Sequence, residues 1–131
     1  ASFALGAQAV QIGSLFAISK ESSAHIEFKK KVIEAKEGDT SLSLKSLMPV
    51  RLLKNEFQQT AFQKETEGAT SDQLKNLLGK GRAKKGIFEG DLINGELEIG
   101  QVSAQICEIK TVKQIMSDLN HQYNLTVKGL Q

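Results

Sequence analysis

The stretch Gln11-Ile12-Gly13-Ser14 closes a short apolar run and combines residue types that can hold a phosphate group. A glycine lets an anion approach the backbone closely, and exposed N–H groups and a serine hydroxyl supply hydrogen-bond donors. In βα-barrels a ligand phosphate commonly sits at the loops that follow strands seven and eight. A plain tight turn after a strand has the same composition. The residues alone leave both alternatives open.

A basic stretch, KGRAKKG at Lys80 to Gly86, carries four cationic side chains within six positions. Its glycines do not have the spacing of a P-loop. Aromatic residues, which would stack on bases, make up only 5% of the chain and do not interrupt this stretch. The pattern favours a solvated turn that neutralises a nearby anion over a nucleic-acid contact.

Residues that could catalyse a reaction or bind a metal are scattered. His25, His121 and Cys107 do not have the spacing of metal ligands. No nucleophile, base and orienting residue can be grouped from the sequence. We therefore expect no catalytic residue and no metal site from this chain alone.

The composition indicates one globular domain with no strong attraction to nucleic acid or membrane. The chain has 131 residues, a formal net charge of +2 and a single cysteine. One cysteine excludes an intrachain disulfide and suits the reducing cytoplasm, where we expect the protein. No apolar run approaches the roughly 20 residues that span a bilayer. The start at Ala1 lacks the basic region of a signal peptide, so we expect a processed chain or a piece of a longer one.

The N-terminal pattern resembles an entry partway through a βα repeat. Ala1 to Leu5 read as the last turn of a helix that ends at Gly6. Residues 8–12 then read as a short buried strand, since Ala9, Val10 and Ile12 are apolar.

The rest of the chain reads as helices joined by loops. Polar residues that could cap helices precede several apolar periodicities. The expected elements are a helix over 24–36 capped by Ser22 or Ser23, a weak strand or extended loop over 40–46, a helix over 51–63 after Pro49, a helix over 72–78 capped by Thr70 or Ser71, a glycine-rich irregular loop over 79–100 with a tight turn or hairpin at Asn94-Gly95, a helical segment over 102–106, and a helix from 112 capped by Thr111.

Three stretches in order, ALGAQAVQIGSLF, KESSAHIEFKK and GDLINGELEIGQVSA, resemble the nitronate monooxygenase family, also called 2-nitropropane dioxygenase-like. Its relatives include flavin-dependent enoyl-acyl carrier protein reductases. The resemblance implies an α/β fold, the C-terminal portion of an FMN-binding (β/α)8 TIM barrel, mostly helical with few strands. It divides this partial domain into 1–63, the last barrel strand with the helices after it, and 64–131, the C-terminal helices with the glycine-rich loop.

The resemblance also implies a cofactor site. The family's Gln-x-Gly-Thr segment, which holds the FMN phosphate, falls on Gln11, Ile12, Gly13 and Ser14, where serine replaces threonine and keeps the hydroxyl. Gly100 and Gln101 resemble a glycine-glutamine pair on the flavin side of the pocket. The family's histidine base lies upstream of this chain.

The implied activity is that of an FMN-dependent oxidoreductase, to which this chain contributes phosphate binding while being inactive when isolated. The alternatives are oxidation of a nitronate and reduction of an enoyl thioester with NAD(P)H in fatty-acid synthesis. The expected partners are a small-molecule substrate and the N-terminal part of the same barrel. Unpaired strand edges would promote oligomers such as a homodimer if the chain stood alone. A non-catalytic binding module is the alternative from another class, favoured by the stretch at Lys80 to Lys85.

Overall fold

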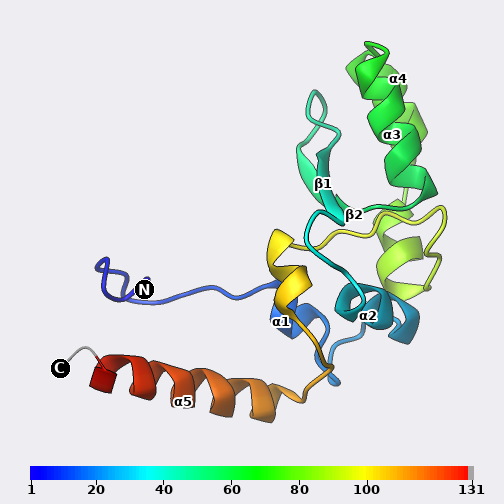
Figure 1. Cartoon of the computed structure of the whole chain (residues 1–131). Helices are drawn as coiled ribbons and strands as arrows, with labels where there is room; N and C mark the ends of the chain where they lie inside the picture. The colour runs from blue at the N-terminus through cyan, green and yellow to red at the C-terminus, as the bar shows by residue number, and fades with distance from the viewer. Residues whose placement is uncertain (130–131) are drawn as a thin grey trace.

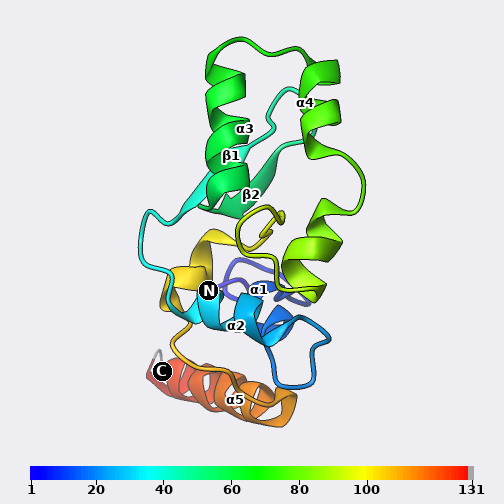
Figure 2. The same cartoon turned by 90° about the vertical axis from the view of Figure 1, so that its right-hand side faces the viewer.

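The computed structural model describes residues 1–129, in which helices predominate and two strands pair (Figure 1). The elements in chain order are α1 (Ser14–Ala17), α2 (Ile26–Ile33), β1 (Thr40–Ser43), β2 (Val50–Leu53), α3 (Glu56–Thr66), α4 (Ser71–Leu78), the π-helical turn η1 (Lys84–Phe88), the 3-10 helix η2 (Gln101–Gln105) and α5 (Val112–Gly129). Both views place α3 and α4 at one end of the molecule and α5 at the other (Figure 2).

The sheet consists of β1 and β2 in antiparallel register, with Leu42 opposite Arg51. A third segment runs beside β2 without forming a full strand. Its contacts are the hydrogen bonds from Leu53 N–H to Leu97 O at 2.9 Å and from Ile99 N–H to Arg51 O at 3.2 Å. These bonds anchor residues 97–99 and place the next residue, Gly100, against α1.

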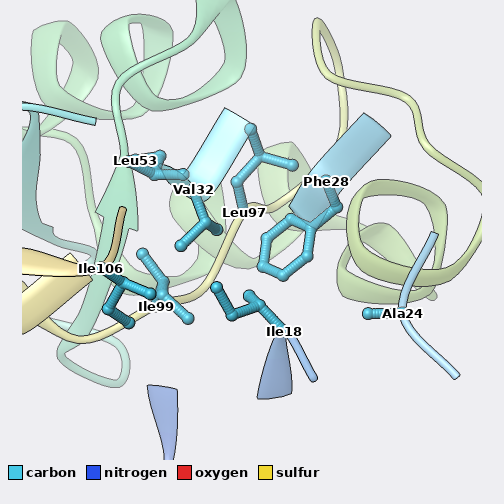
Figure 3. Close-up of a cluster of buried hydrophobic side chains, with 8 residues drawn as sticks. All are labelled: Ile18, Ala24, Phe28, Val32, Leu53, Leu97, Ile99 and Ile106. Carbon is cyan, nitrogen blue, oxygen red and sulfur yellow. The ribbon is translucent and has the colours of Figure 1, made fainter. Parts of the chain in front are cut away.

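Two hydrophobic clusters form the core. The first joins α2, β2 and the segments around α1 and η2 (Figure 3), and contains Ile18, Ala24, Phe28, Val32, Leu53, Leu97, Ile99 and Ile106. The second lies between the hairpin and helices α3 and α4, and contains Leu44, Val50, Leu52, Phe57, Ala61 and Leu74. Because β2 contributes to both clusters, it joins the two halves of the domain.

Polar contacts fix the turn that follows α1. The buried Lys29 ammonium donates to the carbonyls of Ser19 at 2.6 Å and Ser22 at 2.8 Å. The Glu21 carboxylate accepts the Val112 N–H at the start of α5. The turn therefore orients α1 from one side and α5 from the other.

The N-terminal segment and α5 extend to the same side of the molecule (Figure 1). They meet through an edge-on contact of the Phe3 and Tyr123 rings, whose centroids are 5.6 Å apart. Among the described residues of α5 only Ile115 is buried. This end of the molecule has little core of its own.

The predicted buried strand over 8–12 is wrong for this structure. Residues 8–13 are irregular, Val10 and Gln11 are exposed, and Ile12 is half-buried. A buried strand needs a hydrogen-bonded neighbour, and no strand within 1–129 pairs with this segment. An apolar run predicts burial only where a sheet is present to receive it.

The predicted helix over 51–63 is wrong in its first part. Residues 50–53 form β2, so Pro49 precedes a strand, and α3 starts only at Glu56. The spacing of the apolar residues at 50, 52, 53 and 57 suits both a helix and a strand. Pairing with β1 selects the strand. Asn55 lies between the two elements and caps the helix, since its Oδ1 accepts the Gln58 N–H at 2.9 Å.

Other boundaries shift by a few residues. Helix α2 starts at Ile26, and its cap is His25, whose Nδ1 accepts the Glu27 N–H at 3.2 Å, in place of Ser22 or Ser23. The predicted cap of α4 is confirmed at Thr70, which forms a capping box with Gln73.

Candidate functional site

The two sequence-predicted site segments meet through a hydrogen bond. The Gly100 N–H donates to the Ser14 Oγ at 3.0 Å, and the two residues are 86 positions apart. A Cβ atom added to Gly100 would lie 2.6 Å from the same oxygen. Only glycine therefore allows this approach without a shift of Ser14.

The backbone around Gly13 offers unused donors. Within residues 1–129 the N–H groups of Gly13, Ser14 and Leu15 form no hydrogen bond, while the Gly13 carbonyl accepts the Ala17 N–H at 2.9 Å. A Cβ added to Gly13 would meet nothing within 4 Å. Ser14 accepts through its oxygen, so its hydroxyl hydrogen can still be donated. These residues fit an anionic oxygen group such as a phosphate.

Two cavities flank this point. The larger, of about 680 Å³, lies between residues 11–15, the η2 region and α5. The smaller, of about 410 Å³, lies on the β2 side and is lined by Gly13, Ser14, Ala17, Arg51, Ile87, Glu98, Ile99 and Gly100. Gly13 and Ser14 line both cavities, so the turn forms the ridge between them.

The other predicted site residues are placed differently. Gln11 and Ile12 line only the larger cavity. Gln101 is exposed at the start of η2 and lines neither cavity. The structure thus joins Ser14 to Gly100 directly but leaves Gln101 apart from the ridge.

Lys110 in the larger cavity is already neutralised. Its ammonium lies 2.7 Å from an oxygen of Asp118 and 3.0 Å from one of Glu108. The hydrogen bond to Asp118, followed by the one to Glu108, raises the pKa of Lys110 above its usual value. This cation is therefore committed to two carboxylates.

Arg51 is a cavity residue that the sequence reasoning missed. The sequence predicts a helix at this position, whereas Arg51 lies in β2 and lines the smaller cavity beside Gly13 and Ser14. The signal available in the sequence was alternation, since the apolar Val50 and Leu52 flank the charged Arg51. The structure buries both apolar residues and leaves Arg51 half-buried.

Within the basic stretch at Lys80 to Lys85, the Arg82 side chain has a structural role. Arg82 donates to the carbonyls of Leu77, Leu78 and Asn94 and lies over the Phe57 ring, 4.5 Å from its centroid. It therefore closes the end of α4 and ties it to α3.

Nowhere in residues 1–129 do three or more His, Cys, Asp or Glu side chains gather as they would around a metal ion. No helix in that range combines the length and apolarity that crossing a membrane requires.

The family model for nitronate monooxygenase matches residues 1–122. A probable nitronate monooxygenase of Bacillus subtilis (strain 168) is 36% identical over 120 residues, which are 91% of this chain and 34% of that protein. The chain belongs to the nitronate monooxygenase family, as the three sequence stretches predicted.

Solved structures agree with this assignment. FabK from Thermotoga maritima superposes with a TM-score of 0.89 at 37% identity, over 98% of this chain and 41% of that one. Its M276A mutant gives a TM-score of 0.79 at 33% identity, over 98% and 38%. The predicted fold class is confirmed: the structure is α/β, mostly helical, and matches part of a TIM-barrel protein. The chain spans only about a third to two fifths of the length of these relatives.

Proposed function

We propose that the whole protein carrying this chain is an FMN-dependent oxidoreductase, and that this chain supplies its phosphate-binding turn. Bound FMN would supply the redox chemistry. The residues of this chain would hold the cofactor: the N–H groups from Gly13 to Leu15 and the Ser14 hydroxyl would donate to phosphate oxygens. Gln11 and Ile12 lead into the turn, and Gly100 holds Ser14 in place.

One observation carries the proposal. Gly13 has open space above it and unpaired N–H groups around it, next to a serine hydroxyl whose orientation is set by Gly100. Membership in the nitronate monooxygenase family, whose members are flavin-dependent, supports a flavin cofactor as the ligand of this turn.

The reaction we propose first is oxidation of a nitronate, because the family model and the Bacillus subtilis relative both bear that name. The alternative is reduction of an enoyl thioester by NAD(P)H, as in the flavin-dependent enoyl-acyl carrier protein reductases. The high TM-score to FabK favours that alternative. The two relatives are 36% and 37% identical to this chain, so identity does not separate them.

We further propose that the remainder of the barrel covers the N-terminal segment. Phe3, Leu5 and Val10 are exposed, and residues 8–13 lack the neighbouring strands that a barrel would supply. Placing apolar side chains against such strands would remove them from water. The cytoplasm, with its reducing conditions, is the location we propose for the assembled enzyme.

Flavin retention by the Gly13→Val variant tests the phosphate site. In the whole protein, valine would occupy the space above the turn and we expect loss of bound FMN, read from the flavin absorbance of the purified protein. Gly129→Val is the matched control, because a Cβ there also meets nothing within 4 Å and neither glycine has a positive φ. Full flavin content in Gly13→Val would refute the site.

Two assays of the whole flavoprotein separate the reactions. Oxygen consumption with a nitronate and no NAD(P)H is the result expected for the first reaction. NAD(P)H consumption that depends on an enoyl thioester would support the second and exclude a pure nitronate oxidase.

A further inference from the structure

We propose that Arg51 is the side-chain cation that binds the FMN phosphate, and that the phosphate lies in the smaller cavity. This inference rests on the proposed function and assigns a charged ligand that the sequence motif lacks. The segment Gln11 to Ser14 contains only neutral residues. A phosphate held by neutral donors alone would bring its charge into the site without a partner of opposite sign.

The backbone places Arg51 at the turn through a short series of bonds. Its carbonyl accepts the Ile99 N–H, and the next residue, Gly100, donates to the Ser14 Oγ. On the other side of β2, Arg51 is paired with Leu42 of the antiparallel strand β1. Arg51 is therefore held from both sides, and its position relative to Ser14 is set by main-chain contacts.

Its guanidinium has donors to spare. Arginine carries five N–H donors, and the described residues engage one nitrogen, Nη1, which donates to the Thr40 Oγ1 at 3.1 Å. No carboxylate oxygen of residues 1–129 lies within 4.0 Å of it. The bond to Thr40 restrains one end of the group and leaves the remaining donors for a ligand in the cavity.

The charges of the two cavities decide which of them suits an anion. In the larger one, Lys110 is flanked by Glu108 and Asp118, so the cluster carries a net charge of −1 at neutral pH. In the smaller one, Arg51 faces only Glu98, and the sum is zero. A phosphate meets less repulsion beside Arg51.

Glu98 acts against the ligand in this arrangement. It lines the same cavity, and its bridge partner Leu52 neighbours Arg51. A carboxylate facing a phosphate weakens binding, since like charges repel. The proposal thus requires opposite effects from two neighbouring residues: removing Arg51 weakens FMN binding, and removing the charge of Glu98 strengthens it.

The test uses the whole apoprotein titrated with FMN and, separately, with riboflavin, which lacks the phosphate. We expect Arg51→Gln to raise the Kd for FMN by about 10- to 100-fold, the usual worth of charge-assisted hydrogen bonds. The Kd for riboflavin should stay within about twofold, and Glu98→Gln should lower the Kd for FMN. Lys54→Gln is the control for net charge, because Lys54 directly follows β2 and lines neither cavity.

The Arg51→Lys variant tests whether the effect of Arg51→Gln comes from the lost charge or from a folding defect. It keeps the charge, so we expect a smaller loss of FMN affinity than in Arg51→Gln, and a loss that grows with salt. An FMN affinity unchanged in Arg51→Gln overturns the proposal, as does an equal weakening of FMN and riboflavin. If the wild-type apoprotein binds no FMN, the proposed function itself fails. If Gly13→Val loses FMN while Arg51→Gln does not, only this inference fails.

Discussion

The Ser14 Oγ accepts the Gly100 N–H at 3.0 Å and so joins the first turn of α1 to the residue that precedes η2. The bond connects two segments that each resembled a family site but had no visible link in the sequence. It also explains why position 100 is glycine, because any Cβ there would press on the serine oxygen. The ridge between the two cavities depends on this contact.

The contact predicts a strong coupling between substitutions at the two residues. Ser14→Ala removes one hydroxyl bond, worth on the order of 1–2 kcal/mol of FMN binding. Gly100→Ala should cost at least as much, since its methyl group would displace the Ser14 Oγ. In the double variant the obstructing oxygen is absent, so the combined loss should be smaller than the sum. FMN titration of the four proteins measures the coupling, and additive losses would argue against the contact.

Gly95 predicts a large effect on stability away from the cavities. A Cβ there would lie 2.3 Å from the Asp91 carbonyl oxygen and from the Gly86 Cα, both backbone atoms. Gly95→Ala should lower the free energy of unfolding by about 3 kcal/mol, the upper range for overpacking. Gly129→Ala, in open space, should leave it nearly unchanged. Urea denaturation compares the two, and equal midpoints would disprove the close packing of Gly86 on Gly95.

Asn55 predicts a second structural effect. Its Oδ1 caps α3 through the Gln58 N–H at 2.9 Å, and its Nδ2 donates to the carbonyls of Leu92 and Gly95 at 3.0 and 2.8 Å. Asn55→Ala removes all three bonds, so we expect a loss of about 2–3 kcal/mol. Asn76, exposed within α4, is the control, and Asn76→Ala should cost no stability because alanine is the better helix former. Thermal unfolding of both variants checks the difference.

Glu96 predicts a pH dependence of stability. Burial, followed by the nearby charge of Glu98, raises the pKa of the Glu96 carboxyl above its usual value, against the opposing effect of Arg82. Between the unfolded and the folded pKa the folded state binds more protons, so stability falls as pH rises through that window. Glu96→Gln removes the titration and should be more stable than wild type at pH 7.

The advantage of Glu96→Gln should disappear at a pH below the unfolded pKa of glutamate, where both proteins are neutral at this position. Glu67→Gln serves as the contrast, because its hydrogen bond from Lys64 lowers the pKa of Glu67. The pH dependence of stability has the opposite sign for Glu67: any stabilisation from its carboxylate is present above the unfolded pKa and is lost as pH falls. Chemical denaturation at pH 3.5 and pH 7 measures both. A Glu96→Gln advantage that persists at pH 3.5 would exclude this mechanism.

Local side-chain chemistry was sufficient to predict several structural features from the sequence. The Thr70 cap, the glycine end of α4 and the amphipathic α5 follow from side chains within one or two turns of each other. The family also follows from the sequence alone, because three ordered stretches of residues carry it. The proposed phosphate-binding residues, Gln11 to Ser14, follow from the same resemblance.

Where the sequence patterns predict the wrong secondary structure, hydrogen bonds between segments distant in the sequence determine the fold. Residues 50–53 have apolar spacing that suits a helix or a strand, and only the hydrogen bonds to β1 and to residues 97–99 select the strand. That choice moves Arg51 from an expected helix to the cavity beside Gly13. The run before Ile12 shows the converse, since apolar residues stay exposed where no neighbouring strand receives them. Sequence determines what each segment can form, but burial and strand pairing are properties of two segments together, so the tertiary structure alone decides them.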